Sequence, residues 1–195
     1  MKTDIILAGV GGQGILSIAT VIGLAAVNNQ LNIKQAEVHG MSQRGGAVYS
    51  HLRLSDRPVA SDLIPLGKAD IILSVEPMEA LRYLPYLAPG GWLVTNTQPF
   101  VNIGNYPDTS SLMEQLNALQ NRILVDADSL ASECGSAKAS NMVMLGAAVP
   151  FLNMDVKDME TAIASIFERK GEAIVAMNMR ALQAGYLVAM EAKKR

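Results

Sequence analysis

The amino-acid sequence predicts a three-layer α/β domain with a largely parallel sheet and a helical C-terminal region. Up to about residue 126, short apolar segments typical of buried strands alternate with longer helical segments. From about residue 128 onward, the pattern is almost entirely helical. The length of 195 residues suits one domain, so we expect residues 1–195 to form a single unit whose helical part spans about 128–195.

The N-terminal part of the chain predicts three strands and one helix. Asp4–Ala8 is an apolar run of strand length, and Ile33–Val38 is a second strand. The segment Gly14–Asn29 carries apolar residues around most of a helix and must therefore be covered on several sides. Ala47–Leu54 alternates apolar and polar residues, which predicts a half-exposed strand.

The middle of the chain continues this alternation. Ile71–Val75 predicts a buried strand, and Glu76 with Pro77 begins a helix that runs to about Leu87, because proline fits the first helical turn. The glycines and proline of Ala88–Gly91 predict a turn, and Trp92–Thr97 predicts another strand.

A polar, proline-interrupted excursion, Gln98–Ser110, then leads into the last strand and the helices. Ser111–Asn121 predicts a helix capped by Asp108 or Ser110, and Ile123–Asp126 predicts a short strand. The remaining helices are expected at 128–134, 140–151, 155–169 and 172–193.

Composition limits the classes of partner and cofactor. The net charge of −2 supplies no attraction for a phosphate backbone, so we expect no nucleic-acid partner. The single cysteine, Cys134, excludes a disulfide framework within the chain and cannot by itself hold an iron–sulfur cluster or a structural zinc ion. We therefore expect no metal site in this chain.

An uncharged stretch, Ile5–Val27, raises the question of a membrane span or a secretory signal. Its four glycines would weaken a lone helix, and Asp4 stands where a signal peptide carries positive charge. We therefore expect a cytoplasmic protein without a membrane-spanning segment.

The most informative motif is GVGGQG, which directly follows the first expected strand. A dinucleotide-binding turn is expected where a strand leads through a GxGxxG motif into an apolar helix. The order of a strand, Gly9-x-Gly11-x-x-Gly14 and an apolar helix in this chain matches that context. In that interpretation Gly9 allows the tight turn, Gly11 the approach of a phosphate, and Gly14 close helix–sheet packing. The helix start, with Gly12 and Gln13, then offers amides to an anion. Alternatively, the glycines make a sharp turn whose gap is filled by another protein segment.

A second glycine-rich motif, HGMSQRGG, follows the second expected strand. A dinucleotide site needs an acidic residue about 20 positions after the turn, and Glu37 is near that place. His39 offers an acid, a base or a hydrogen-bond donor, and Arg44 a fork for a carboxylate or phosphate. Ser42 and Gln43 add donors. We interpret this segment as a functional loop rather than a merely solvated one.

GVGGQGIL together with EVHGMSQRGGAV resembles the gamma-type domain of 2-oxoacid:ferredoxin oxidoreductases. The similarity extends to ADIILSVEPMEALRYLPYLAPGG and to SNMVMLGAAV, so it covers most of residues 3–150. Within the family, the chain is most similar to the separate beta subunit of indolepyruvate:ferredoxin oxidoreductase. GxGxxG alone would be weak evidence for this family, whereas the two glycine motifs together are fairly specific for it.

The resemblance implies a Rossmann-like fold and a role in the oxidative decarboxylation of aryl pyruvates to acyl-coenzyme A. It implies thiamine diphosphate and iron–sulfur clusters on a larger, alpha-type partner subunit, coenzyme A as co-substrate, and ferredoxin as the acceptor served by the complex. This chain alone should be inactive and contribute no catalytic residue. The positions expected to face the cofactors and the partner are Gly9, Gly11, Gly12, Gln13, Gly14, His39, Gly40, Ser42, Gln43, Arg44, Gly45 and Gly46.

Two other functions stay open from the residues alone. One is a free-standing NAD- or FAD-dependent oxidoreductase that holds a pyrophosphate at the glycine turn. The other is a non-catalytic binding domain. The subunit of a heteromeric oxidoreductase predicts no activity without its partner, whereas the free-standing enzyme predicts measurable affinity of the isolated chain for NAD or FAD.

Several other residues have two interpretations. Glu76 is either at a ligand edge or a helix-start residue, and Asn141 more simply caps a helix than meets a ligand. His51 is expected to be exposed or at an edge. The methionines could form an adaptable docking surface, but core filling is the favoured interpretation. The wide apolar band of the last helix indicates either subunit packing or a central buried helix.

Overall fold

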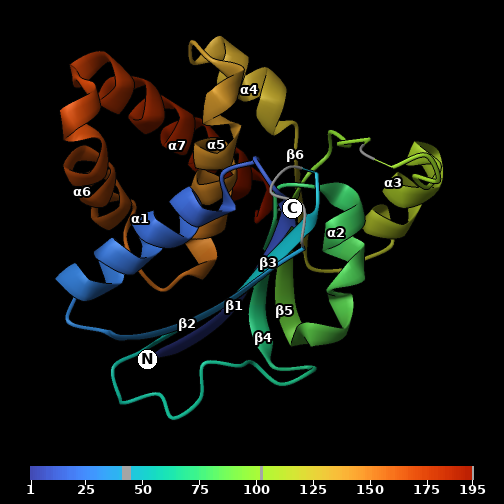
Figure 1. Ribbon diagram of the computed structural model, residues 1–195, viewed down its shortest axis with the longest axis horizontal. Coiled ribbons are helices and arrows are strands. Elements are labelled where there is room, and N and C mark those ends of the chain that lie inside the picture. The colour runs from blue at the N-terminus through green and yellow to red at the C-terminus, as the bar shows by residue number, and fades with distance from the viewer. Residues whose placement is uncertain (41–44, 102, 195) are drawn as a thin grey trace.

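The computed structural model describes residues 1–40, 45–101 and 103–194 and forms three layers (Figure 1). The strands are β1 (Lys2–Val10), β2 (Asn32–His39), β3 (Ala47–Ser55), β4 (Ala69–Ser74), β5 (Leu87–Asn96) and β6 (Arg122–Val125). The α-helices are α1 (Ile15–Asn28), α2 (Pro77–Arg82), α3 (Thr109–Asn117), α4 (Ala127–Glu133), α5 (Ser140–Ala148), α6 (Val156–Phe167) and α7 (Glu172–Ala192). Short 3₁₀ helices cover Leu84–Tyr86, Ala137–Ala139, Val149–Phe151 and Glu168–Lys170.

The strands form one sheet in the order β2-β3-β1-β4-β5-β6. The pairs β1–β4, β4–β5 and β5–β6 are parallel, whereas β3 runs antiparallel to both of its neighbours, β1 and β2. The expected largely parallel α/β fold is therefore confirmed. The antiparallel strand β3 lies between β2 and β1, so residues on β2 are one strand further from the end of β1 than they would be if β2 paired with β1.

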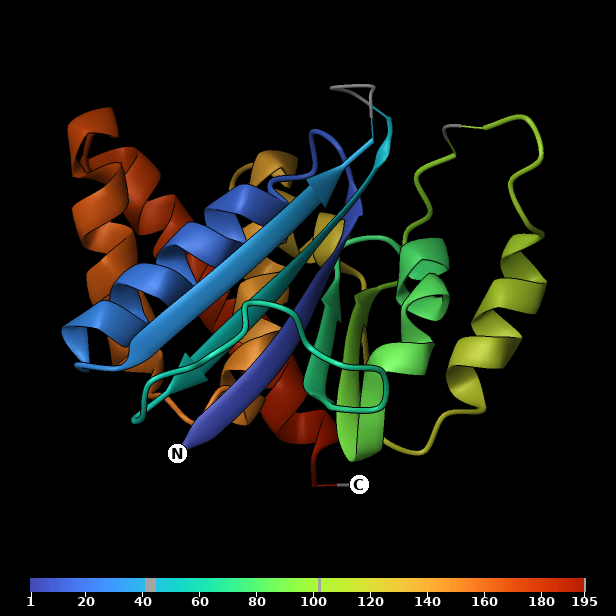
Figure 2. The ribbon, with the colours of Figure 1, turned by 60° about the horizontal axis from the view of Figure 1, so that its bottom comes forward.

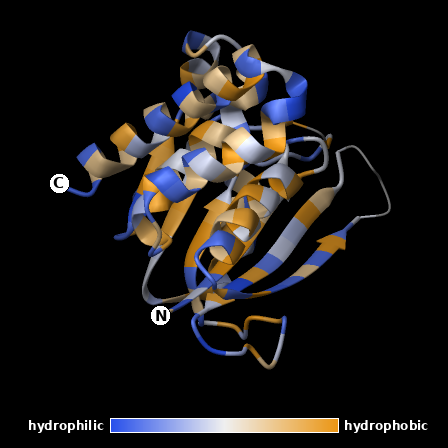
Figure 3. Ribbon diagram, turned by 90° about the vertical axis from the view of Figure 1, so that its left-hand side faces the viewer, coloured by the Kyte–Doolittle hydropathy of each residue, from blue (hydrophilic) through white to orange (hydrophobic). Residues whose placement is uncertain are grey.

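The sheet is covered on both faces. Helices α1, α5, α6 and α7 lie on one side, and α2 and α3 lie on the other (Figure 1). In β1, Ile5 and Leu7 enter the core under α1, whereas Ile6 and Ala8 enter the core under α2. Burial on both faces explains why this strand reads as a continuous apolar run. Figure 3 shows the strands largely in the orange of hydrophobic residues, with blue stretches on the helices around them.

The helices α5 and α7 approach each other closely. A Cβ at Gly146 would lie 2.8 Å from the carbonyl carbon of Leu182, and one at Gly185 would lie 2.8 Å from that of Val143. Each glycine therefore lets the backbone of the partner helix pass directly over it. This contact fixes α7 against the helical layer.

The other face of α7 stays open. This helix is long and apolar enough to cross a membrane by length and composition alone, yet only 28% of its most apolar stretch is buried in the fold. Leu187 is 57% exposed. Of the two interpretations of the wide apolar band, a fully buried central helix is wrong.

Core filling by methionine is confirmed, since Met142, Met144 and Met159 are completely buried. Two expectations on the bounds of the second helix and of β5 were wrong. The helix that begins after Glu76 ends at Arg82 rather than Leu87. The expected turn Ala88–Gly91 lies within β5, where Gly90 has a φ of 82°.

The strand β3 is mostly buried rather than half-exposed, because it lies inside the sheet between β2 and β1. For the same reason His51 is buried, with 4% exposure, instead of standing at an edge. Its Nδ1 accepts a hydrogen bond from the Ile64 amide at 3.1 Å. Sequence alternation alone could not reveal that the loop carrying Ile64 covers this face.

Candidate functional site

The glycine turn between β1 and α1 lies at the carboxyl edge of the parallel strands. Gly12 and Gly14 have φ values of 101° and 81°, a left-handed region that glycine adopts without steric cost. The Gln13 side chain closes the turn: its Oε1 accepts from the Val10 amide at 2.8 Å, and its Nε2 donates to the Val75 carbonyl at 3.5 Å. Gln13 therefore holds β1 and β4 together across their ends.

The roles of individual glycines differ from those expected. A Cβ on Gly9 would collide with Val75 and lie 2.9 Å from Ile15 Cδ1, so Gly9 permits close packing rather than a turn. The turn itself depends on Gly12 and Gly14. A Cβ on Gly14 would lie 3.0 Å from Asn141 Cγ, so this glycine packs against α5 and not against the sheet.

The two glycine motifs meet in space. The Gly11 amide donates to the Gly46 carbonyl at 2.8 Å, and the Gly45 amide donates to the Gly11 carbonyl at 3.3 Å. The Gly40 amide, directly after β2, donates to the carbonyl of Ala47, the first residue of β3, at 3.1 Å. The C-terminal end of the second motif, Gly45 and Gly46, thus lies on the glycine turn. The expected donors Ser42, Gln43 and Arg44 lie outside the described residues.

A cavity of about 740 Å³ lies between the turn, the start of α1 and the hairpin of β2 and β3. Its lining residues are Val10, Gly11, Gly12, Gly14, Ile15, Leu16, Ser17, Glu37, His39, Gly40 and Val48. Among the described residues, no hydrogen bond occupies the amides of Gly12, Gly14, Ile15 or Leu16. Because these amides lie at the start of a helix, they form a positive wall.

The opposite wall of this cavity carries one carboxylate. Glu37 Oε1 is buried and lies 3.1 Å from His39 Nδ1, yet it accepts no hydrogen bond within the described part of the chain. A buried carboxylate oxygen in this condition favours a ligand that brings a hydroxyl or amine donor. The cavity therefore combines anion donors, an acceptor and the apolar side chains of Val10, Ile15 and Val48.

A second cavity, of about 540 Å³, lies on the other side of the turn. Gly12, Gln13 and Gly14 line it together with Val75 and the segment Gln98–Phe100. The chain leaves β1 toward one face of the sheet and leaves β4 toward the other, so this cavity lies at the position where α/β proteins usually bind ligands.

Asn141 lines the second cavity beside the glycine turn. Its Nδ2 donates to the Gly14 carbonyl at 3.3 Å, and the cap of α5 is Ala139, which makes no side-chain hydrogen bond. The expectation that Asn141 caps its helix is therefore wrong. The close contact explains why position 14 must be glycine, a relationship across 127 residues that no local pattern reveals.

Glu76 lines neither of the two cavities at the glycine turn, in keeping with its interpretation as a helix-start residue. Its completely buried carboxylate accepts the Glu79 amide at 2.8 Å as a helix cap. It also accepts the Phe100 amide at 3.3 Å and the Tyr106 hydroxyl. This desolvated environment and the Glu76 bond raise the pKa of Tyr106.

The sheet order conflicts with an ordinary dinucleotide site. There, the acidic residue that binds the ribose follows the strand next to β1. Here Glu37 stands on β2, and β3 lies between β2 and β1. Since strands are spaced by roughly 4.8 Å, the acidic residue is displaced by one further strand from the turn.

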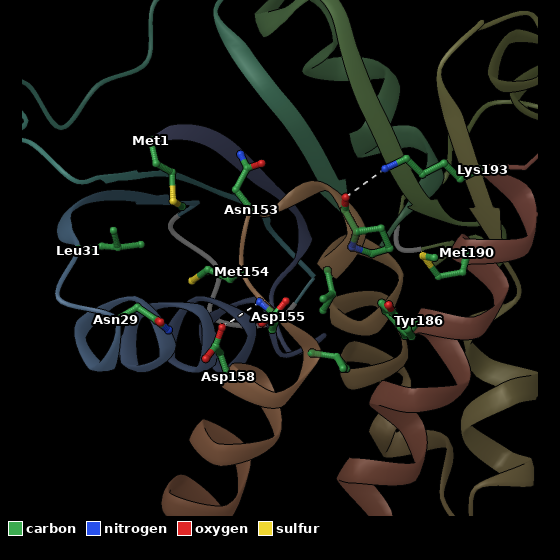
Figure 4. Close-up of a pocket in the computed structure, with 13 residues that line it drawn as sticks. Met1, Asn29, Leu31, Asn153, Met154, Asp155, Asp158, Tyr186, Met190 and Lys193 are labelled. Carbon is green, nitrogen blue, oxygen red and sulfur yellow. Dashed lines mark hydrogen bonds between the residues drawn. The ribbon is translucent and has the colours of Figure 1, made fainter.

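A separate cleft of about 560 Å³ lies away from both glycine motifs, near Met1 and the C-terminal part of α7 (Figure 4). Several of its polar groups are already paired. Lys193 Nζ donates to the Pro150 carbonyl at 3.4 Å, and the Asp155 amide donates to Asp158 at 2.8 Å. No group of three or more potential metal ligands occurs in residues 1–40, 45–101 and 103–194.

The profile described as pyruvate ferredoxin/flavodoxin oxidoreductase matches residues 4–188. The chain belongs to this family. It is 37% identical over 195 residues to the indolepyruvate oxidoreductase subunit IorB of Archaeoglobus fulgidus, covering 95% of this chain and 94% of the relative. The resemblance seen in the sequence is thereby confirmed.

Solved structures agree with the fold. The keto/oxoacid ferredoxin oxidoreductase gamma subunit from Geobacter sulfurreducens has a TM-score of 0.71 at 25% identity, covering 97% of this chain and 99% of that one. The 2-oxoglutarate:ferredoxin oxidoreductase from Magnetococcus marinus, solved with 2-oxoglutarate, coenzyme A and succinyl-CoA, has a TM-score of 0.77 at 21% identity. The match covers 97% of this chain but 31% of that longer one.

Proposed function

We propose that the chain is the small subunit of a heteromeric 2-oxoacid:ferredoxin oxidoreductase in the cytoplasm, with indolepyruvate or another aryl pyruvate as substrate. The complex would cleave the 2-oxoacid to carbon dioxide, join the acyl group to the thiol of coenzyme A, and pass the released electron pair to ferredoxin. Near-complete coverage of an indolepyruvate oxidoreductase subunit supports this function. The ferredoxin and the larger, alpha-type subunit are parts of the proposal.

Thiamine diphosphate and iron–sulfur clusters are assigned to the larger subunit. An iron–sulfur cluster needs several cysteine thiolates, and this chain has only Cys134. The residues present here therefore do not fit a cluster, and no step is assigned to one in this chain. What the chain contributes is a binding surface.

The observation that carries the proposal is the hydrogen bond between Gly11 and Gly46, which brings both glycine motifs to one recess. We assign the 740 Å³ cavity to part of coenzyme A. The amides of Ile15 and Leu16 would meet a phosphate, and Glu37 would accept from a hydroxyl or amino group. The partner would complete the recess on its open side.

A free-standing NAD- or FAD-dependent enzyme is the weaker alternative, because β3 removes Glu37 from its expected place beside β1. Calorimetric titration distinguishes the two. We expect the purified complex to bind coenzyme A and the isolated chain to bind neither NAD nor FAD with micromolar affinity. Tight dinucleotide binding by the isolated chain would reverse this ranking. If the chain does not co-purify with a larger subunit, a simple binding domain would be favoured.

A further inference from the structure

Three large apolar side chains stand exposed on one short segment between β5 and α3. The exposed fractions are 44% for Phe100, 68% for Val101 and 41% for Ile103. Single exposed apolar residues are ordinary, whereas several on one segment mark a surface that another molecule covers. The sequence from Gln98 to Pro107 also contains no charged residue. Depletion of charge and an aromatic residue are typical of the centre of a protein interface.

The segment is held in place by polar groups rather than by its own apolar side chains. Glu76 accepts hydrogen bonds from the Phe100 amide and from the Tyr106 hydroxyl, and it is completely buried. Gln98 donates from its side chain to Asp126 at 3.1 Å. The usual arrangement of a loop is thus reversed, with polar anchors inside and apolar side chains outside. The anchors of the segment are therefore polar and main-chain groups, and Val101 is the most exposed of the three apolar side chains.

The segment lies at the same edge of the sheet as the glycine turn. Gln98, Pro99 and Phe100 line the 540 Å³ cavity, whose other wall contains Gly12 and Gly14. Figure 2 shows this segment and the described ends of the hairpin between β2 and β3 rising at the same end of the molecule. A molecule that completes the recess at the glycine turn can therefore reach Phe100 and Val101 as well.

We infer that Phe100, Val101 and Ile103 form a docking surface for the larger subunit; this inference rests on the proposed function. In the Magnetococcus marinus enzyme the matched region is 31% of a longer chain, so most of that polypeptide lies outside the equivalent of this chain. In the proposed complex, we assign the place of that additional polypeptide to a separate chain. Its contact patch should be apolar, to match an uncharged segment.

The test uses the larger subunit of the oxidoreductase from the same organism, purified separately and identified by mass spectrometry. Its affinity for the wild-type chain is compared by calorimetry with that of Val101→Asp, and of the milder Val101→Ser. Leu66→Asp is the matched control, because Leu66 is 65% exposed and lies in the loop before β4. The docking segment follows β5, which is parallel to β4, so the two loops lie at opposite ends of the sheet. Circular dichroism melting confirms that each variant is folded.

We expect Val101→Asp to weaken binding by about tenfold or more, Val101→Ser by less, and Leu66→Asp by less than about twofold. Equal weakening by Val101→Asp and Leu66→Asp, or no weakening by folded Val101→Asp, would overturn the docking surface. A homodimer that Val101→Asp dissociates would also overturn it, because the occupant would be a second copy. If the wild-type chain itself does not bind the larger subunit, the proposed function fails instead.

Discussion

Gly11 and Gly46 are joined by a main-chain hydrogen bond of 2.8 Å, although they belong to motifs on different parts of the chain. The bond ties the turn after β1 to the start of β3, because Val10 and Ala47 are cross-strand neighbours. A recess with amide donors on one wall and Glu37 on the other is the result. The function proposed for the chain depends on this recess.

Gly9→Ala should destabilise the fold. The added methyl group would collide with Val75 in a closely packed interior, and overpacking of this kind costs about 1–3 kcal/mol in the free energy of unfolding. Gly104→Ala is the control, because it has open space around it, and it should change stability by less than about 0.5 kcal/mol. Urea denaturation measures both. Equal effects of the two variants would contradict the packing role of Gly9.

Glu37→Gln should raise the KM of the complex for coenzyme A by about tenfold, the usual weight of one hydrogen bond to a charged group, and leave kcat unchanged. The reason is that Glu37 lines the larger cavity and that its Oε1, although 3.1 Å from His39 Nδ1, accepts no hydrogen bond among the described residues. Glu168→Gln, at an exposed carboxylate after α6, serves as control. Steady-state kinetics of the reconstituted complex measure the effect. An unchanged KM would remove coenzyme A from this wall of the cavity.

Glu76→Gln should loosen the segment Gln98–Tyr106. A glutamine cannot accept all the hydrogen bonds that the buried carboxylate accepts. We therefore expect a loss of about 2 kcal/mol in the free energy of unfolding and faster chymotrypsin cleavage after Phe100. Glu133→Gln, at an exposed carboxylate, is the control. Cleavage at the wild-type rate in Glu76→Gln would show that the anchor does not order the segment.

His51 should make stability depend on pH. Burial lowers its pKa from the ordinary value of 6.5, and nearby Asp62 opposes the shift while Arg53 supports it. The folded state thus favours the neutral ring, whose Nδ1 accepts from Ile64. The stability from this preference is complete above the unfolded pKa and declines as the pH falls from about 6.5 toward the lower folded pKa.

Urea denaturation at about pH 7.5 and about pH 5.5 tests this dependence. In His51→Gln the decline between the two conditions should become smaller, whereas His39→Gln, which removes the other histidine, should keep it. A decline of the same size in the wild type and in His51→Gln would mean that other groups cause it.

Sequence patterns predicted the strands and helices well because both faces of the sheet are covered. Runs such as Ile5–Ala8 and Ile71–Leu73 are buried on both sides and are therefore apolar throughout. Element ends were predicted less well. The strand β5 begins at Leu87, just before the glycines that indicated a turn. Leu87 already pairs with Ala69 of β4, and regular pairing resumes at Trp92 after a shift of register, so the glycines lie in an irregular stretch of the strand.

The site could be predicted only in part. The two glycine motifs are visible in the sequence, but their hydrogen bonds depend on β3 entering the sheet between β2 and β1. The contact of Asn141 with Gly14 and the anchoring of Tyr106 on Glu76 join residues far apart in the chain. Such contacts are set by packing and leave no periodic signal.

The most direct test is reconstitution from separately purified subunits. The 2-oxoacid-dependent and coenzyme A-dependent reduction of ferredoxin is measured for this chain, for the larger subunit and for their mixture, with indolepyruvate as substrate. We predict that the mixture alone is active and that activity saturates at a fixed ratio of the two chains. Full activity of the larger subunit without this chain, or an inactive mixture of two folded and cofactor-loaded subunits, would contradict the account.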